Sequence, residues 1–163
     1  MTAFKDKVAL VTGGGRDIGR AISVKLAAAG ARVCVNYAND EASAQETLRQ
    51  IQAAGGQAIV HRADVTDATQ VAGLVAATQQ AFGERIDVLV NVAGGMLARK
   101  PLAEIDEGFF QQVMDLNLKS VYLTSRAVAP LMGEGGAIVN FASLAGRDGG
   151  GPGAAIYATA KAA

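Results

Sequence analysis

The sequence has one cysteine, one histidine and no tryptophan in 163 residues. A single cysteine cannot form an intrachain disulfide, and Cys34 lies in a short apolar run, where we expect a small buried side chain. The single histidine, His61, has no cysteine or histidine neighbours at ligand spacing, so no metal site is predicted. These scarcities favour a reduced, cytoplasmic protein stabilised by a hydrophobic core.

The sequence also lacks net charge and long apolar runs. Its 15 basic and 15 acidic residues cancel, which leaves no basic surface for nucleic acid or an anionic membrane. No apolar run approaches the roughly 18 residues of a membrane span, and residues 1–7 lack the apolar core of a signal peptide. With 50% hydrophobic and 18% charged residues, we expect one domain over residues 1–163 whose partners are small molecules.

Short apolar runs alternate with stretches of helical periodicity along the whole chain. Strands are predicted over residues 8–11, 32–36, 58–60, 86–90 and 137–141, with helices between them. This alternation predicts an α/β fold, a doubly wound parallel sheet of the Rossmann type in three α/β/α layers, with ligands at the carboxyl ends of the strands. Residues 106–131 form one long helical pattern that is apolar on more than one face, which indicates deep burial or a subunit contact.

A glycine cluster follows the first predicted strand. Gly13, Gly14 and Gly15 come directly after an apolar run, and helical periodicity begins at Ile18. The first N–H groups of a helix lack intrahelical partners and carry the positive end of its dipole, so this turn could hold a diphosphate. A glycine cluster alone is weak support, because an ordinary strand-to-helix turn has the same composition.

Tyr157 and Lys161 are four residues apart, which places both side chains on one face of a helix. A nearby ammonium group stabilises a phenolate, so the tyrosine could exchange a proton with a carbonyl or alcohol oxygen near neutral pH. Taken alone, such a pair is common on helix surfaces. The surrounding motifs therefore decide its interpretation.

Taken in order, these motifs resemble the short-chain dehydrogenase/reductase family over essentially the whole chain. The matching positions are the glycine loop from Thr12 to Gly19, Asp64 and Val65 after the third strand, Asn91 to Gly94 after the fourth, then Asn117, Ser143, Tyr157 and Lys161. The resemblance implies an NAD(P)-binding Rossmann domain that belongs to an oxidoreductase.

The resemblance also implies the catalytic roles. Tyr157 would be the acid/base, and Lys161 would tune it and bind the nicotinamide ribose. Ser143 would orient the substrate oxygen, and Asn117 would hold a relay water. Without the other motifs, Ser143 could equally be a turn residue at a strand end, and Asn117 a polar residue of a helix.

The predicted cofactor preference depends on the end of the second strand. It ends in Asn36 and Tyr37 without the carboxylate that usually binds the adenosine ribose, while Arg16 in the glycine loop could pair with a 2′-phosphate. NADP(H) is therefore favoured over NAD(H), although Arg16 could also be a solvated charge at a helix start. The predicted cofactor-binding residues are Gly13, Gly15, Arg16, Asp17, Ile18, Gly19, Asn36, Asp64, Val65, Asn91, Ala93, Gly94, Tyr157 and Lys161.

Two positions depart from the family pattern. Asp17 stands where the family usually has glycine, and its carboxylate would repel a diphosphate. We expect Asp17 to turn away from the phosphates, and Asp17→Gly to tighten cofactor binding. Val92 replaces a second asparagine, which we interpret as a variation in packing.

The chain ends two residues after Lys161, whereas the family continues through further strands. We therefore expect an incomplete chain, a frayed last helix, an exposed edge on the fifth strand, and a mobile loop over residues 149–153.

The predicted function is an NADP(H)-dependent oxidoreductase that interconverts a secondary alcohol and a ketone. In its motifs the chain is similar to members such as the 3-oxoacyl-acyl-carrier-protein reductases, and the complete protein is expected to be a dimer or tetramer. The alternative is a non-catalytic dinucleotide-binding module or an inactive fragment of such an enzyme. A methyltransferase on a similar sheet would leave Ser143, Tyr157 and Lys161 unexplained.

Overall fold

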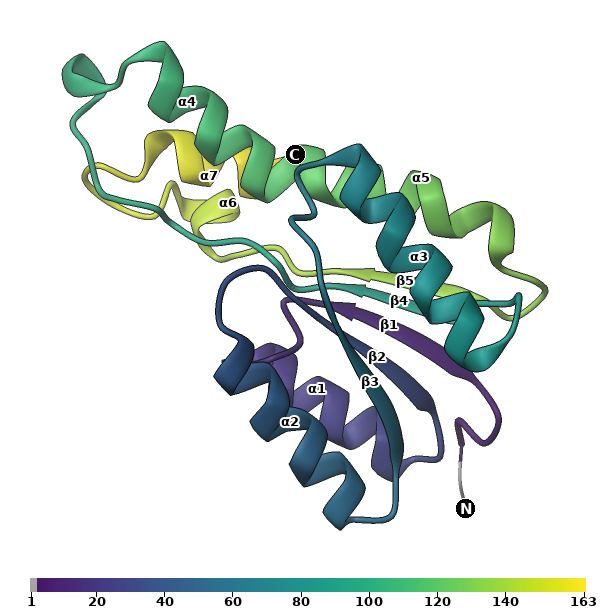
Figure 1. Ribbon diagram of the computed structural model, residues 1–163. Helices are drawn as coiled ribbons and strands as arrows, with labels where there is room; N and C mark the ends of the chain where they lie inside the picture. Colours follow the sequence, from purple (N-terminus) through teal and green to yellow (C-terminus); the bar gives the residue numbers. More distant parts are fainter. Residues whose placement is uncertain (1–2) are drawn as a thin grey trace.

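The computed structural model describes residues 3–163 (Figure 1). Five parallel strands form one sheet in the order β3-β2-β1-β4-β5, which confirms the predicted doubly wound topology. In the centre of the sheet, Leu10 pairs with Cys34 on one side and with Leu89 on the other. The strands are β1 Val8–Thr12, β2 Arg32–Tyr37, β3 Gln57–Arg62, β4 Val88–Asn91 and β5 Ala137–Asn140.

Helices cover both faces of this sheet, as Figure 1 shows. The helices α1 (Asp17–Ala28) and α2 (Glu41–Ala53) lie on one face, and α3 (Ala68–Phe82) and α5 (Ser120–Val128) lie on the other. Successive side chains of β1 point to opposite faces, so each face needs its own apolar partners. The apolar run of β1 does not alternate with polar residues because both of its faces are buried.

Three helices begin at an aspartate that accepts a hydrogen bond from a backbone N–H of the first turn. Asp40 accepts from Ser43 at the start of α2, and Asp67 accepts from Thr69 at the start of α3. Asp106 does the same for α4 (Glu107–Met114). The start of α1 differs, because its N-cap residue Arg16 makes no side-chain capping bond. The first N–H groups of α1 are therefore left for another partner.

The helical pattern predicted over residues 106–131 is confirmed as a continuous helical segment, but its geometry is not α-helical throughout. A π-helical turn, Asp115–Lys119, separates α4 from α5, and a short 3-10 turn, Ala129–Leu131, follows α5. The Asn117 side chain in this turn donates to the carbonyl oxygen of Val113 at 2.9 Å, and the Ser120 hydroxyl at the start of α5 donates to that of Leu116 at 2.7 Å. Side chains that bind helix carbonyls in this way disturb the regular bonding pattern.

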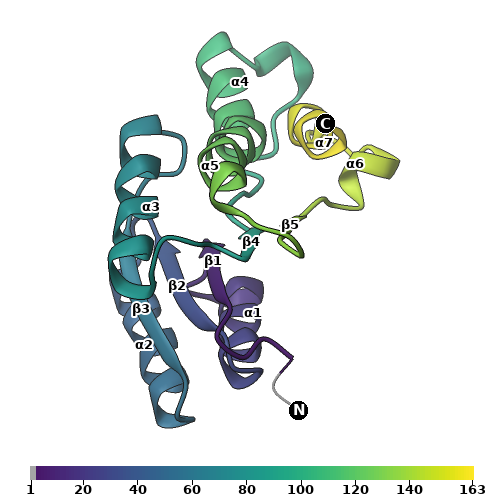
Figure 2. The same ribbon diagram turned by 90° about the vertical axis from the view of Figure 1, so that its right-hand side faces the viewer.

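The end of the sheet is open at β5. This strand is at the edge of the sheet and all four of its residues are exposed, which confirms the predicted exposed edge. The helices α6 (Ala145–Asp148) and α7 (Ala155–Ala162) follow on the same side of the sheet as α4 and α5 (Figure 2). Helix α7 is formed through Ala162, so the predicted fraying is not observed: α7 packs on α4 and on α6, where Gly146 lies against its last turn.

The glycine-rich loop before α7 is hydrogen-bonded to a distant segment. Arg99 Nη1 donates to the carbonyl oxygens of Gly150 at 3.0 Å and Pro152 at 2.7 Å, and the Lys100 N–H donates to Gly153. These bonds join the loop to the segment that precedes the short 3-10 turn Leu102–Glu104. None of the helices within residues 3–163 has the length and apolar character needed to cross a membrane.

Candidate active site and cofactor cleft

A cavity of about 300 Å³ lies at the carboxyl edge of the sheet, between β1 and β4. After β1 the chain continues through β2 and β3 on one side, and it returns to β4 on the other. Ligands of parallel α/β sheets bind at such a point of reversal. The residues that line the cavity, most of which the sequence predicted, are Gly13, Arg16, Asp17, Ile18, Gly19, Val92, Ala93 and Gly94.

Polar groups of the second strand and second helix hold the glycine loop in place. Asn36 accepts from the Gly13 N–H through its side chain at 3.3 Å and from the Gly14 N–H through its backbone at 2.9 Å. The Gly15 carbonyl accepts from Thr47 Oγ1 at 2.8 Å and from Arg20 Nη2 at 3.0 Å. Arg20 and Thr47 were not predicted, because only the folded chain brings them together. Asn36 is buried, so its predicted contact with the cofactor remains a prediction.

Glycine is required at the closest approach between the loop and β4. Gly13 has a φ of 61°, and a Cβ atom there would lie 3.0 Å from the backbone nitrogen of Ala93. Beside it, the Thr12 hydroxyl oxygen accepts hydrogen bonds from the N–H groups of Val92 at 3.1 Å and Ala93 at 3.2 Å. This contact fixes the loop after β4 against the glycine loop. Thr12 is a positioning residue that sequence reasoning did not single out.

Asn91 connects three elements through its side chain. Its Nδ2 donates to Asn140 Oδ1 of β5 at 2.9 Å, and its Oδ1 accepts from the Thr124 hydroxyl of α5 at 2.8 Å. The amide is buried and bonded at both ends. Any contact from Asn91 to a cofactor would therefore use its backbone, and the predicted contact remains a prediction.

A second cavity, of about 320 Å³, lies beyond the carboxyl end of β2. Arg16 lines it together with Tyr37, Asn39 and Asp40. Asp40 was missed as a site residue because it follows β2 by three positions and reads only as a helix cap. The hydrogen bond from the Ser43 N–H above all, with a smaller contribution from the Arg16 charge, holds the pKa of Asp40 below its ordinary value.

Asp64 and Val65, which were predicted to bind the cofactor, are engaged or buried in the structure. Asp64 follows the end of β3 and its Oδ1 accepts from both the N–H and the hydroxyl of Thr66, at 2.9 and 2.8 Å. Asp64 lines a separate cavity of about 460 Å³ with Arg62 and Leu97. Val65 is buried in the core. Their contacts with a cofactor remain predictions.

Gly94, Asn117 and Lys161 come together from the loop after β4, the π-helical turn and α7. A Cβ atom at Gly94 would lie 2.9 Å from Asn117 Oδ1 and 3.0 Å from Lys161 Nζ. The Asn117 amide accepts from the Gly95 N–H at 2.9 Å and donates to the Gly95 carbonyl at 3.0 Å. Lys161 Nζ donates to the Phe141 carbonyl at 2.8 Å, and partial burial lowers its pKa. The site thus holds an ammonium group without a carboxylate partner in residues 3–163.

Tyr157 precedes Lys161 by one turn of α7, and Ser143 lies between β5 and α6. The Ser143 hydroxyl oxygen accepts from the Ala145 N–H at 3.2 Å. Within the described residues the Tyr157 hydroxyl has no hydrogen-bond partner, and Lys161 is directed to the Phe141 carbonyl instead. Both hydroxyl groups can therefore still donate to a ligand.

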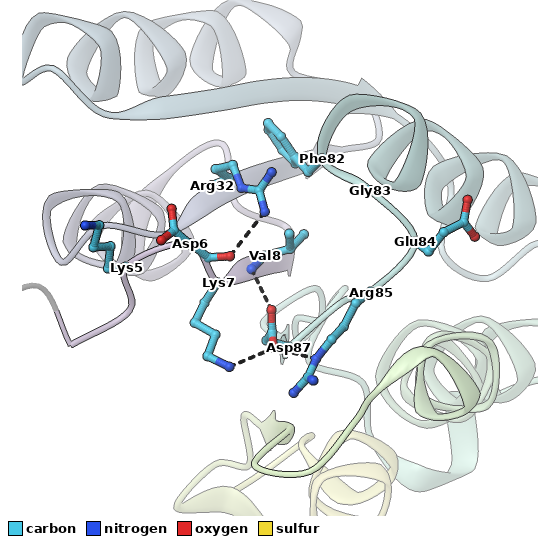
Figure 3. A pocket seen from close by; sticks show the side chains of 10 residues that line it. All are labelled: Lys5, Asp6, Lys7, Val8, Arg32, Phe82, Gly83, Glu84, Arg85 and Asp87. Carbon is cyan, nitrogen blue, oxygen red and sulfur yellow. Dashed lines mark hydrogen bonds and ion pairs between the residues drawn. The ribbon is translucent and has the colours of Figure 1, made fainter.

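A further cavity, of about 460 Å³, lies at the opposite, amino edge of the sheet (Figure 3). Three of its charged side chains, Lys7, Arg85 and Asp87, are paired with one another. Asp87 accepts from Lys7 Nζ at 3.1 Å and from the Val8 N–H at 3.0 Å, and it forms an ion pair with Arg85 at 2.7 Å. The Asp87 carboxylate is thus bound by the protein's own contacts, whereas the Arg16 side chain at the carboxyl edge is 71% exposed.

The family model described as short chain dehydrogenase matches residues 7–163. The chain belongs to this family of oxidoreductases. It is 44% identical to the 3-oxoacyl-[acyl-carrier-protein] reductase of Synechocystis, covering 99% of this chain and 65% of that protein.

Two solved structures of this family carry a nucleotide. A short chain dehydrogenase from Burkholderia cenocepacia in complex with NADP has a TM-score of 0.92 at 36% identity, covering 98% of this chain and 64% of that one. The NADH-dependent reductase A1-R′ complexed with NAD has a TM-score of 0.93 at 38% identity, covering 99% and 69%. The chain therefore spans about two thirds of the length of these relatives.

Proposed function

We propose that this chain carries the cofactor-binding and proton-transfer part of an NAD(P)(H)-dependent oxidoreductase that interconverts a secondary alcohol and a ketone. The observation that carries the proposal is the meeting of Gly94, Asn117 and Lys161 at the carboxyl edge, one turn from Tyr157. An uncapped helix start lies across the same edge. Family membership supports the reaction type.

The residues present fit a dinucleotide. The first residues of α1 line the cavity between β1 and β4, and this helix start has no side-chain cap. Backbone N–H groups at a helix start are suited to bind a diphosphate. The absence of side chains at Gly13 and Gly94 lets Ala93, Asn117 and Lys161 pack closely beside the cavity. Lys161 would bind the nicotinamide ribose, and the bound nicotinamide would supply or accept the hydride.

Tyr157 is proposed to exchange the proton. In the reducing direction its hydroxyl donates to the carbonyl oxygen of the substrate, and in the oxidising direction its phenolate takes the proton back. Ser143 would orient that oxygen with a second hydrogen bond. Lys161 stabilises the phenolate through its charge. Because three of the hydrogen-bonding positions of the Asn117 amide are already used, its proposed relay water would bind to the remaining lone pair or to the backbone.

NADP(H) is proposed as the preferred cofactor. The Arg16 side chain is 71% exposed and lines the cavity beyond β2, where an adenosine 2′-phosphate would lie. A guanidinium group binds a phosphate with two parallel hydrogen bonds. The substrate would be a small carbonyl compound or alcohol, in line with the reductase among the relatives.

The proposed complete protein is a cytoplasmic dimer or tetramer. Phe110 of α4 and Tyr122 of α5 are exposed large side chains on the long helical segment that the sequence assigned to deep burial or a subunit contact. Their exposure supports the second of those alternatives. Size-exclusion chromatography with light scattering would measure the assembly.

The test compares the full-length natural protein with its Tyr157→Phe variant. We expect NADPH to bind to both proteins with equal affinity, measured by nucleotide fluorescence. Turnover of NADPH with a panel of ketones and acyl thioesters should fall by about a hundredfold or more in the variant. Binding without turnover in the natural protein would instead identify a dinucleotide-binding module, and absence of binding would overturn the proposal.

A further inference from the structure

Arg16 borders two cavities, and each contains one carboxylate. The cavity beyond β2 is lined by Arg16 and Asp40, and the cavity between β1 and β4 is lined by Arg16 and Asp17. Among the described residues that line these two cavities, Arg16 is the only basic one. An anion that binds to a guanidinium group in either cavity must therefore bind to Arg16, and it competes there with the carboxylate of that cavity.

The two carboxylates are held in different ways. Asp40 accepts from the Ser43 N–H at 2.9 Å as the cap of α2, so a rotation of its side chain would break the cap. Asp17 has no such bond. Its Oδ2 lies 3.7 Å from Arg16 Nε, and the two side chains are 81% and 71% exposed, which describes a loose ion pair that can open readily.

The backbone at Asp17 is unusual. Its φ of 48° is in the left-handed region, which glycine adopts freely and which aspartate and asparagine tolerate better than other residues. Asp17 is also the first residue of α1, directly after Arg16. The position thus holds a carboxylate next to the arginine that would bind a 2′-phosphate, in a conformation that offers no stability of its own.

We propose that Asp17 determines cofactor specificity by competing with the 2′-phosphate of NADP(H) for Arg16. The inference rests on the proposed function. A 2′-phosphate must displace the Asp17 carboxylate from Arg16, whereas NAD(H), which has no such phosphate, leaves the pair in place. Asp17 therefore reduces the preference for NADP(H) over NAD(H) that Arg16 creates. Repulsion of the diphosphate by Asp17 would act on both cofactors equally, so the ratio of the two affinities isolates the competition.

The experiment measures the dissociation constants of NADPH and NADH by fluorescence titration of the full-length protein. Asp17→Asn removes the charge, keeps the shape and tolerates the left-handed backbone. We expect the NADPH-to-NADH affinity ratio to rise by about two- to fivefold, the range for an exposed ion pair. Asp17→Gly should give the same affinity ratio as Asp17→Asn, because it removes the same charge. Its additional effect, the relief of backbone strain, should change the two affinities equally.

Arg16→Gln and the double variant Arg16→Gln/Asp17→Asn are the controls. If Asp17 acts through Arg16, the rise caused by Asp17→Asn disappears in the Arg16→Gln background. An unchanged ratio in Asp17→Asn, or a rise that persists without Arg16, would overturn the inference while nucleotide binding still stands. If neither nucleotide binds the natural protein, the proposed function and the inference both fail, and this result is distinct from an unchanged ratio.

Discussion

At the amino edge of the sheet the Asp87 side chain is 7% exposed and contacts two cations and a backbone N–H, while at the carboxyl edge Arg16 and Asp17 are largely exposed and loosely paired. The two edges belong to the same parallel strands (Figures 1 and 3). Charges at the amino edge are used to hold β1 and β4 together. At the carboxyl edge many polar groups are also bonded within the protein, but the Arg16 side chain is largely exposed and the start of α1 has no side-chain cap, so a ligand could gain binding energy there.

The largest effect is expected from Asp87→Asn. The asparagine can still accept from the Val8 N–H, but Lys7 and Arg85 lose their common counter-charge. We expect the free energy of unfolding to fall by about 1.5–3 kcal/mol, because the buried Asp87 side chain loses its charge-assisted bonds, whereas Lys7 and Arg85 are nearly half exposed and stay solvated in the variant. Urea denaturation measures this change.

The matched control for Asp87→Asn is Glu46→Gln, which removes the exposed ion pair with Arg49 and should have little effect. Nucleotide affinity of folded Asp87→Asn should stay unchanged if the edges are independent. Equal losses of stability in the two variants would show that the Asp87 cluster contributes no more than an exposed ion pair.

Lowering the pH should also reduce the free energy of unfolding, because it protonates Asp87 as the substitution by asparagine neutralises it. Burial alone would raise the pKa of Asp87, but the Val8 hydrogen bond and the Lys7 and Arg85 charges outweigh it and hold the pKa below its ordinary value. A lowered pKa in the folded state adds stability above the unfolded value near 4 and loses it as the pH falls through the folded pKa.

We expect the unfolding free energy to fall between about pH 4 and the lower folded pKa of Asp87. In Asp87→Asn that part of the decline should be missing, as measured by urea denaturation in a pH series. Identical pH profiles for the two proteins would exclude Asp87 as its source.

A neighbouring pair of glycines tests the carboxyl edge. At Gly94, with a φ of 155°, a Cβ atom would collide with Asn117 Oδ1 and Lys161 Nζ, whereas at Gly95 a Cβ atom would meet no atom within 4 Å. Gly94→Ala should displace Lys161 and weaken nucleotide binding by about tenfold, or about 1.4 kcal/mol. Gly95→Ala is the matched control and should bind normally. Comparable losses in both variants would contradict the proposed ribose contact of Lys161.

Much of the fold could be predicted because its signals are local. The apolar runs of the strands, the aspartates at Asp40 and Asp67 and the glycine cluster act through neighbours in the sequence. Strand ends were less accurate: β4 begins at Val88 rather than at residue 86, although the Asp87 backbone still donates to the Val8 carbonyl and accepts from the Ala137 N–H.

The site could be predicted only as a set of positions. The structure brings Gly94, Asn117 and Lys161 together, as the motif order suggested. It also engages the side chain of Asn91 in the sheet and adds Asp40 to the cavity beyond β2, which no sequence pattern indicated. Such roles depend on tertiary contacts between residues distant in the chain, and the spacing of residues in the sequence does not predict these contacts.

The smallest expected effect comes from two aspartates that share a strained backbone but lie at opposite edges. Asp6 and Asp17 are the non-glycine residues of positive φ within residues 3–163, at 63° and 48°. Replacing either by glycine relieves the strain and adds flexibility to the unfolded chain, so each should gain only about 0.5 kcal/mol of stability. Thermal unfolding would measure this as a rise of about 1–2 °C.

Only Asp17→Gly should also tighten nucleotide binding, because only its carboxylate lies beside the cofactor cleft. If Asp6→Gly tightens nucleotide binding as much as Asp17→Gly does, the gain in affinity comes from relief of backbone strain and not from removal of the Asp17 charge. The two edges of the sheet would then not be independent.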